Sequence, residues 1–455
     1  MGSDALILGG GFAGLSCAVD LAAAGLKVRV LEKKPHLGGR AYSYKDPATG
    51  DAVDNGQHLF MGCYRKTRAF LARIGCSPLL RFEPGARVDY AEPGGARDLL
   101  NCPPFLGAPL NLAWGVARLR GLSWGDKWGL VRLDRALRRV AREGAAPPEL
   151  DRVTVRQWLD SLGAGARLQR RLLDPIALGV LNDDPGIAAA TGLAQAMADM
   201  FYRGAQGSRL GLSTGGLSEL YTGGARKFIE ERGGQVIESR RAAGFIKENG
   251  RVDGIVLEDG TQVRAQAVVS TLPPWDLRRL DLPAAARGPW EKLGAAPIVS
   301  VCLWLDRPVL DREPLIGLLG TDIHWVFNKS RIFGRRGDGQ YLSLVISGAR
   351  RHVALSPAEI LEIARRDLAA CLPRFKDAKI TAWKVIKEPF ATLSPCPGSE
   401  ALRPTPGELS PGLFVAGDWT RTGLPATIES AVASGQAAAA AVLAARGNAK
   451  IASED

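Results

Sequence analysis

The stretch Asp4-Ala-Leu-Ile-Leu8, followed by Gly9-Gly10-Gly11-Phe12-Ala13-Gly14, decides the fold of this chain. An apolar run short enough for a buried parallel strand leads directly into the glycines, and a helical pattern begins at Ala13. Gly9 permits a tight turn, Gly11 lets the backbone approach a pyrophosphate, and Gly14 lets the helix pack closely on the strand. The stretch predicts a strand–turn–helix unit with phosphates at the helix N-terminus. The candidate contacts are Gly9, Gly11, Phe12, Ala13 and Gly14.

A second strand is predicted over residues 27–31, and Glu32 stands at its end, about 20 residues after the glycines. A carboxylate there is placed to accept hydrogen bonds from an adenosine ribose. It also disfavours a 2′-phosphate, so we do not expect NADP at this site. We include the neighbouring Lys33 among the candidate cofactor contacts.

Gly38-Gly39-Arg40 indicates which dinucleotide is bound. A second pair of glycines and a cation just past the ribose carboxylate suit a longer ligand that folds over the loop. Arg40 could neutralise the pyrophosphate or lie near the flavin end. The arrangement resembles the FAD-binding fingerprint of the flavin amine oxidase and phytoene desaturase superfamily. We therefore predict FAD as the cofactor.

Polar residues stand against an apolar run in Asp54-Asn55-Gly56-Gln57-His58, which precedes residues 59–62. The glycine among them suggests backbone that passes close to a ligand, and the position along the chain favours the isoalloxazine ring. We expect Asn55, Gly56, Gln57 and His58 to contact the cofactor. The alternative is a polar turn before a strand.

The C-terminal segment supplies the second half of the predicted flavin site. Residues 413–416 read as a strand, and a helix opens within 423–429 with Pro425 in its first position. Asp418 could bind a ribityl hydroxyl or the pyrophosphate, and the helix dipole would point at the flavin N1–C2=O edge. The candidate contacts, including one residue of an earlier strand, are Gly417, Asp418, Pro425, Ala426, Thr427, Ile428 and Val236.

Residues 100–200 read mainly as helices, and two motifs in the middle of the chain suggest other chemistry. The sequence from Asn182 to Ile187 lacks the third aspartate of a diphosphate-binding motif, so we assign it to helix capping. Gly211-Leu-Ser-Thr-Gly215 matches the nucleophile elbow of hydrolases, which requires a preceding strand. Residues 203–209 look like a loop instead, and only four histidines could supply a base. We expect re-entry into the nucleotide domain, with a helix over 217–231.

Two sheets are predicted after this point. A β-meander comprises short strands at 235–238, 243–246, 251–257 and 262–264, and residues 267–271 then return to the parallel sheet. A second sheet comprises strands at 299–305, 323–327, 341–346 and 379–385, with a helix over 357–372. Its polar face could roof a cavity or only pack against the protein. The residues of that face are Ser300, Cys302, Trp304, His324, Tyr341 and Ser343.

At 455 residues the chain is long enough for two intertwined domains. We predict an α/β fold with a discontinuous Rossmann-like FAD-binding domain, a substrate domain on a mixed sheet, and a helical subdomain. The FAD-binding domain is predicted to comprise 1–95, 205–290 and 395–447. The helical subdomain takes 96–204, the substrate sheet 291–394, and the tail 448–455.

The formal charge is +12, from 59 Lys and Arg against 47 Asp and Glu, which could favour nucleic acid or anionic lipid. The distribution favours lipid over nucleic acid. Residues 101–142 carry eight basic and two acidic side chains, a net of +6, with Trp114, Trp124 and Trp128 among leucines. This composition is typical of an interfacial membrane helix. The alternative is a helical subdomain with a solvated basic face.

Other features bear on location. No apolar run approaches the roughly 20 residues that span a bilayer, and the chain opens directly into a strand without a leader. The seven cysteines are odd in number and form no CxxC pair, so we predict reduced thiols and no metal site. We therefore expect a cytoplasmic protein that is peripheral on the inner membrane face.

Taken together, the nucleotide motifs, residues 54–64, Trp325-Val-Phe327 and residues 417–429 resemble the bacterial hydroxysqualene dehydroxylases of hopanoid synthesis over nearly the whole chain. Phe327 is followed here by Asn328-Lys329, where we would expect an acidic residue and an arginine. The resemblance implies reductive removal of the hydroxyl of hydroxysqualene, an isoprenoid lipid, to give squalene. The electrons would come from an external donor.

In such a reaction an acid must help the allylic hydroxyl to leave, and reduced flavin N5 delivers hydride to the resulting cation. Asp54 and His58 are the candidate acids because both are expected near the flavin. The alternatives are Tyr64, Tyr202 and Tyr341. Two other functions stay open. One is an oxidative carotenoid-type desaturase, and the other is a non-catalytic prenyl-lipid escort, whose nucleotide site would be degraded.

Overall fold

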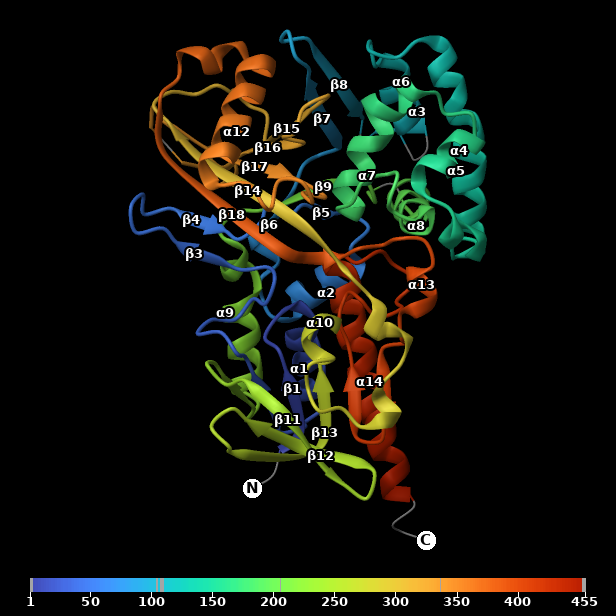
Figure 1. The fold of residues 1–455 in the computed structure, drawn as a ribbon, viewed down its shortest axis with the longest axis vertical. Helices are drawn as coiled ribbons and strands as arrows, with labels where there is room; N and C mark the ends of the chain where they lie inside the picture. Colours follow the sequence, from blue (N-terminus) through green and yellow to red (C-terminus); the bar gives the residue numbers. More distant parts are fainter. Residues whose placement is uncertain (1–2, 104, 107–109, 205, 336, 452–455) are drawn as a thin grey trace.

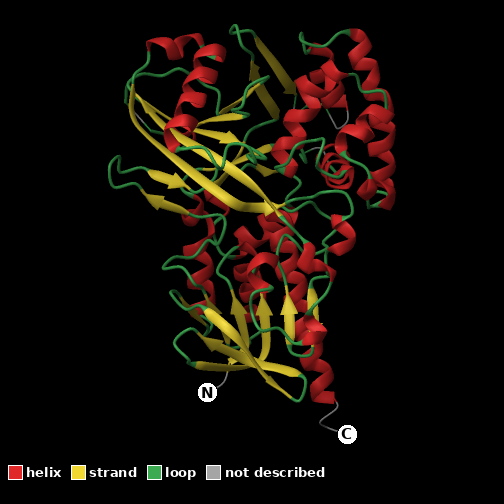
Figure 2. Cartoon of the chain, viewed as in Figure 1, coloured by secondary structure: helices red, strands yellow, loops and turns green. Residues whose placement is uncertain are grey.

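The computed structural model describes residues 3–103, 105–106, 110–204, 206–335 and 337–451. Two sheets organise the molecule (Figure 1), one in the lower half beside both chain ends and one in the upper left. A group of helices fills the upper right (Figure 2). The predicted α/β class is confirmed.

The lower sheet is built from segments far apart in the sequence. Its parallel part runs in the order β10 (Gln235–Ile237), β2 (Val28–Leu31), β1 (Ser3–Leu8), β13 (Gln262–Ser270) and β20 (Leu413–Val415). β19 (Gly407–Ser410) pairs antiparallel with β20. Strands from the N-terminal part, the middle and the C-terminal part of the chain therefore lie side by side in this sheet. Their carboxyl ends meet along one side of it.

The predicted meander is present, but its first strand is elsewhere. β11 (Ala242–Glu248) and β12 (Arg251–Leu257) extend β13 as an antiparallel hairpin. β10, which we had assigned to the meander, instead lies parallel to β2 at the opposite edge. Val236 is buried opposite Val30, and the Arg29 Nε donates to Gln235 Oε1 at 3.0 Å, so side-chain packing at this edge determines the position.

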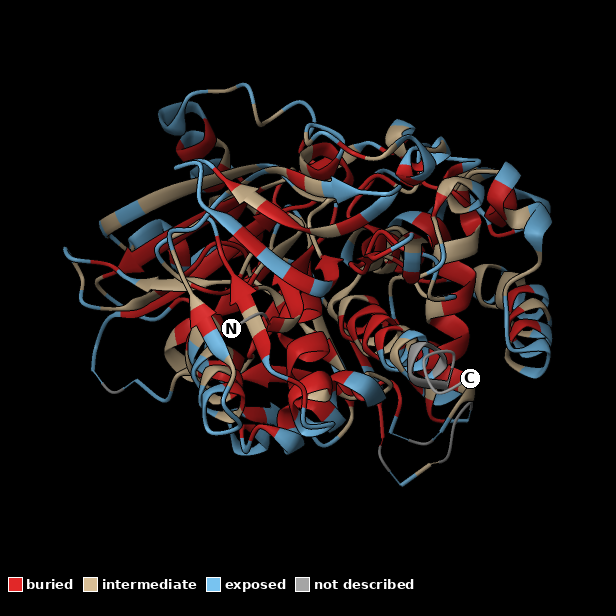
Figure 3. Ribbon diagram, turned by 90° about the horizontal axis from the view of Figure 1, so that it is seen from below, coloured by how far each residue is buried: buried red, intermediate tan, exposed pale blue. Residues whose placement is uncertain are grey.

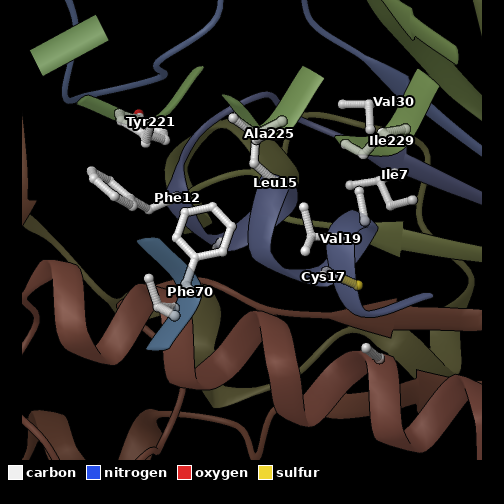
Figure 4. Close-up of a cluster of buried hydrophobic side chains, with 14 of the residues drawn as sticks. Ile7, Phe12, Leu15, Cys17, Val19, Val30, Phe70, Tyr221, Ala225 and Ile229 are labelled. Atoms are coloured by element: carbon white, nitrogen blue, oxygen red, sulfur yellow. The ribbon is translucent and has the colours of Figure 1, made fainter. Parts of the chain in front are cut away.

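Three helices cover the parallel sheet: α1 (Phe12–Ala23), α9 (Leu217–Glu230) and α14 (Ile428–Ile451). Figure 4 shows the core that they form, in which Phe12 stacks on Tyr221 with ring centroids 3.7 Å apart. α14 approaches α1 closely, because a Cβ added at Gly435 would lie 2.2 Å from the Ala13 carbonyl oxygen. Viewed from below, the buried residues gather in these inner elements and the exposed ones on the outer helices and loops (Figure 3).

One helix departs from the expectation that no segment is long and apolar enough to cross a membrane. Residues Ile428–Gly447 of α14 meet both criteria, with a mean hydropathy of 1.3. Nearly half of that window is buried inside the protein, and Val432, Ala438 and Val442 belong to the core against α1. The apolar character of α14 is therefore used in packing.

The upper sheet has the order β18 (Ile380–Leu393), β14 (Ala295–Leu305), β17 (Gln340–Ile346), β16 (Trp325–Asn328), β15 (Leu315–Leu318), β7 (Ala86–Ala91) and β8 (Arg97–Cys102). α12 (Pro357–Cys371) covers the face that carries Val299, Val301 and Leu303. The opposite face carries Cys302, Trp304 and Tyr341, as the alternation predicted. β7 lies within residues 1–95, which we had assigned to the FAD-binding domain, yet it pairs in this sheet.

The helical group follows β8, which we had assigned to the helical subdomain 96–204 but which pairs in the upper sheet. It comprises α3 (Leu110–Arg118), α4 (Trp124–Glu143), α5 (Val155–Ser161), α6 (Ala166–Leu168), a π-helical turn (Gln169–Leu173), α7 (Asp174–Leu181) and α8 (Ala190–Tyr202). Asn182 ends α7 in the left-handed conformation, and the Asp184 Oδ1 accepts the Gly186 N–H at 2.6 Å. Capping is therefore the observed role of this motif. The buried Asp183 pairs with Arg350 at 2.5 Å.

Shorter elements join these layers. They are β3 (Ser43–Lys45), β4 (Ala52–Asp54), β5 (Phe60–Met61), α2 (Arg65–Arg73), β6 (Leu80–Phe82), β9 (Leu210–Ser213), α10 (Pro274–Leu277), α11 (Lys329–Ile332) and α13 (Ser399–Leu402). The described residues of 203–209 contain no strand, as expected, and the short strand β9 overlaps the Gly211–Gly215 motif itself. Its Ser213 hydroxyl is buried and finds no hydrogen-bond partner among the described residues, so the elbow has no base.

Candidate functional site

The phosphate-binding turn has the predicted geometry. Gly9 has a φ of +109°, and a Cβ at Gly14 would lie only 1.9 Å from the Gly9 carbonyl oxygen, so the tight turn and the close helix both require glycine. A Cβ at Gly39 would lie 3.2 Å from the Gly11 Cα, and the Gly38 N–H donates to the Gly10 carbonyl at 2.9 Å. The two glycine loops therefore pack on each other, and the contact of Gly11 with a pyrophosphate stays a prediction.

Glu32 is buried and held by backbone donors. Its Oε2 accepts the Gly10 N–H at 2.8 Å and its Oε1 accepts the Lys34 N–H at 2.9 Å. Each oxygen keeps a lone pair for a ribose hydroxyl. The Lys33 ammonium instead pairs with Asp276 at 2.7 Å. The predicted contact of Lys33 with the cofactor stays a prediction.

Arg40 joins the two ends of the chain. Its guanidinium forms an ion pair with Asp418 and donates to the Ala391 carbonyl at 3.3 Å. The Tyr221 hydroxyl shares its proton between the carbonyl oxygens of Gly38 and Ala41, at 2.9 and 3.0 Å. These contacts hold the loop that contains Gly38 and Gly39 in place. The structure thus brings together the fingerprint and the C-terminal segment that the sequence assigned to one site.

Asp54 is one half of a buried ion pair. Its Oδ2 lies 2.7 Å from the Lys329 Nζ, and its Oδ1 accepts the Leu217 N–H at the start of α9, at 2.9 Å. Lys329 also donates to the Gln57 Oε1 at 2.9 Å. Both carboxylate oxygens of Asp54 are therefore engaged within the protein, and Asp54 is not among the residues that line the cavity described below. We had given Lys329 no role, because nothing in the sequence relates it to residue 54.

His58 lies beside this pair. One ring nitrogen, Nδ1, is 2.9 Å from the Gly56 carbonyl, which assigns the proton to Nδ1 and leaves Nε2 as an acceptor. Burial lowers the pKa of His58, and the charges of Arg40 and Lys329 add to that effect, so the ring is neutral at pH 7. The neighbouring Asn55 side chain bonds the Tyr42 N–H and the Arg40 carbonyl, and therefore shapes the backbone of this segment.

The C-terminal helix begins later than predicted. α14 starts at Ile428, and the Thr427 Oγ1 accepts the Ser430 N–H at 3.4 Å, so Thr427 is the cap and Pro425 lies before the helix. Free N–H groups of this first turn remain available to a flavin carbonyl. The segment 417–424 is fixed by Arg403, a buried residue that the sequence analysis missed. Its guanidinium donates to the carbonyls of Trp419, Asp418 and Leu424 at 3.3, 2.9 and 3.0 Å.

Two other candidate contacts can involve the backbone only. The Phe12 ring is buried against Tyr221 and Phe70, and Val236 is buried in β10. The Val236 carbonyl accepts a hydrogen bond from Arg226 at 3.2 Å. The roles of these residues, and of Ala13, Ala426 and Ile428, stay predictions.

A cavity of about 230 Å³ adjoins the C-terminal segment. It lies between the start of α2, α7, α8 and residues 424–429, and most of its lining is apolar. The lining residues include Met61, Cys63, Tyr64, Val180, Ala196, Met200, Leu424, Pro425 and Thr427, together with Asp199 and Glu429. The cavity therefore reaches two of the predicted flavin contacts, Pro425 and Thr427.

The two carboxylates of the cavity have different surroundings. Glu429 accepts the N–H groups of Lys66 and Thr67 and the Thr67 hydroxyl at 2.7–2.9 Å, so it caps α2. Asp199 lies on α8, accepts 3.2 Å hydrogen bonds from the Gln195 amide at both oxygens, and lies 3.0 Å from the Arg203 Nε. Burial is the largest influence on Asp199 and raises the pKa of its carboxyl, although Arg203 opposes it.

Three predicted alternatives for the acid are placed differently. Tyr64 lines the cavity, and burial raises the pKa of its hydroxyl beyond the normal range. The Tyr202 hydroxyl donates to Asp134 at 2.6 Å, and the Tyr341 hydroxyl donates to the Ala52 carbonyl at 3.4 Å. Tyr64 is therefore the one of the three that faces the cavity.

Comparison with known proteins identifies the family of this chain. The family model described as "Flavin containing amine oxidoreductase" matches residues 12–443. The chain is 31% identical to the hydroxysqualene dehydroxylase of Rhodopseudomonas palustris, with 96% of this chain and 98% of that protein covered. It is 29% identical to the hydroxysqualene dehydroxylase of Sinorhizobium fredii, over 95% and 96%. It is also 27% identical to the 15-cis-phytoene desaturase of Solanum lycopersicum, over 97% and 77%.

Solved structures share the fold. A putrescine oxidase bound to putrescine superposes with a TM-score of 0.75 at 17% identity, over 98% of this chain and 99% of that one. The cyclohexylamine oxidase from Brevibacterium oxydans gives 0.72 at 18% identity, over 97% and 99%. With the family match and the intact glycine loops, Glu32 and helix N-termini, the predicted cofactor FAD is confirmed.

Proposed function

We propose that this chain, which belongs to the family of flavin-containing amine oxidoreductases, is an FAD-dependent enzyme that removes the hydroxyl of hydroxysqualene to give squalene. The observation that carries the proposal is a largely apolar cavity that Asp199 lines and that reaches Pro425 and Thr427. The full-length resemblance to two hydroxysqualene dehydroxylases supports the choice of substrate.

In the proposed reaction the cofactor and the protein have separate roles. Protonation of the allylic hydroxyl lets it leave as water and creates a delocalised carbocation, which takes up a hydride. FAD, when bound in its reduced form, would supply that hydride, and an external electron donor would restore the reduced state. The lining includes the apolar residues Met61, Val180 and Met200. Apolar side chains around the carbocation would limit the access of water, which would otherwise return the hydroxyl.

Asp199 is the residue that we assign as the acid. Burial favours its protonated form, as a proton donor in an apolar cavity requires. After the proton has been given away, Arg203 and Gln195 stabilise the carboxylate at 3.0 and 3.2 Å. We prefer Asp199 to our first candidates because Asp199 lines the cavity, whereas neither Asp54 nor His58 is among its lining residues.

An anaerobic single-turnover experiment tests the function. We expect dithionite-reduced holoprotein to be reoxidised by hydroxysqualene, with one squalene formed per flavin as measured by absorbance and gas chromatography. Unchanged reduced flavin after long incubation would contradict the proposal. Bleaching of oxidised flavin by phytoene would favour the desaturase, to which the 27% identity with the tomato enzyme gives some weight.

A further inference from the structure

Large hydrophobic side chains are exposed together on one part of the helical group. Six of the eleven such residues among the described part of the chain fall within residues 105–131. Trp124 and Trp128 are each 72% exposed, and Phe105 is 82% exposed. We call this surface the tryptophan face, and its members are Phe105, Leu110, Trp114, Trp124, Trp128 and Val131. A soluble surface rarely gathers so many large apolar side chains without a partner.

The periodicity of α4 explains how the face forms. Trp124, Trp128 and Val131 are four and then three residues apart, so they project from one side of the helix. Leu133, Leu137 and Val140 occupy the opposite side and are buried in the helical core. α4 therefore has two apolar stripes. One packs in the helical core, and the other faces outward and takes no part in that packing.

Basic side chains border the tryptophan face. The Lys127 ammonium lies 4.9 Å from the Trp124 ring centroid and donates to the Ala117 carbonyl at 2.8 Å, which joins α4 to the end of α3. Arg118 lies 5.4 Å from the Trp114 ring. Among the described residues, Arg118, Lys127, Arg132 and Arg135 form no ion pair with an acidic side chain. Of the acids, Asp126 is engaged in the capping box of α4, and Asp134 pairs with Arg138.

We propose that the tryptophan face docks on an anionic phospholipid bilayer. Indole and leucine side chains suit the boundary of headgroups and acyl chains, and the bordering cations suit lipid phosphates. A second copy of the chain is a poor occupant, because a symmetric contact would set one basic surface against another. The proposal does not depend on the reaction. It refines the predicted membrane partner from residues 101–142 to specific side chains.

The test uses the full-length holoprotein in flotation with vesicles of phosphatidylcholine that contain phosphatidylglycerol. The paired variant Trp124→Ser/Trp128→Ser is compared with Trp383→Ser/Phe390→Ser, which removes two exposed aromatic residues from β18, where they are 43% and 51% exposed. Flavin content and light scattering without lipid establish that each variant is folded and whether it self-associates.

We expect the wild type and the β18 variant to float with anionic vesicles, and the α4 variant to bind at least about tenfold more weakly. Binding should fall steeply with added salt and with neutral vesicles, since the cations contribute through screened charge. Equal binding of the two variants would overturn the proposal. So would an absence of wild-type binding, or a dimer in solution that the α4 substitutions dissociate.

Discussion

The Lys329 ammonium lies 2.7 Å from the Asp54 carboxylate, and both side chains are almost fully buried. The pair links α11 of the upper sheet to the end of β4, next to the segment predicted to pass the flavin ring. Its third partner, Leu217, starts the helix α9 of the lower sheet. This ion pair and the hydrogen bond to Leu217 therefore connect elements that adjoin the upper and the lower sheet.

Replacing one member of this pair should destabilise the protein strongly. We expect Lys329→Met to lower the free energy of unfolding by about 3–5 kcal/mol, because Asp54 is left as an unpaired buried charge. Urea denaturation of the holoprotein measures the loss. Arg264→Gln, which breaks an exposed pair with Glu248, is the matched control and should leave the free energy of unfolding almost unchanged. If the double variant Asp54→Asn/Lys329→Met regains part of the lost free energy of unfolding, the unpaired charge explains the loss. Equal losses in Lys329→Met and Arg264→Gln would refute this explanation.

Asp199→Asn should keep FAD and lose the chemical step. A positioned acid contributes about 10²–10⁴-fold in rate, so we expect a loss of that size in single-turnover flavin reoxidation by hydroxysqualene. Flavin content, measured by absorbance, is the control for folding. A variant with near wild-type rates would move the search to Tyr64, which also faces the cavity.

The pH dependence of the rate provides a second test of Asp199 as the acid. The pKa of this carboxyl is raised, and the protonated form is the donor, so the wild-type rate should be constant at low pH and decline as pH rises through that pKa. The residual rate of Asp199→Asn should lack this decline. An unchanged profile in the variant would assign the titration to another group.

His58→Ala should have a small effect on the rate. Burial and neighbouring cations lower the pKa of His58, so the ring carries no second proton to donate at neutral pH. We expect less than about a tenfold change in single-turnover rate with FAD retained. A loss as large as that of Asp199→Asn would restore His58 to the role that the sequence first suggested.

The flavin should be bound without a covalent bond. Residues 417–435 contain neither cysteine nor histidine, the usual attachment points, although they form the C-terminal half of the site. Acid precipitation of the yellow protein should release all FAD to the supernatant. Flavin that stays in the pellet would contradict this expectation.

The sequence by itself determined the phosphate-binding half of the site. Gly9, Gly11, Gly14 and Glu32 lie within a single strand–turn–helix–strand unit, where spacing alone fixes which backbone groups face the ligand. The structure contains this strand–turn–helix–strand unit, and the contacts of its residues with the cofactor stay predictions. The alternation along β14 and β17 likewise predicted the two faces of the upper sheet, because period two is a local property of a strand.

Only the tertiary structure decided the rest. Lys329 and Asp54 are 275 residues apart, and Asp199 reaches the cavity through packing of α8 against the start of α2 and residues 424–429. Arg403 and β10 were missed or misplaced for the same reason. Burial and charge pairing depend on which surfaces meet, and no local pattern encodes that meeting. The acid of the proposed reaction belongs to this second class, since its pKa is set by its surroundings.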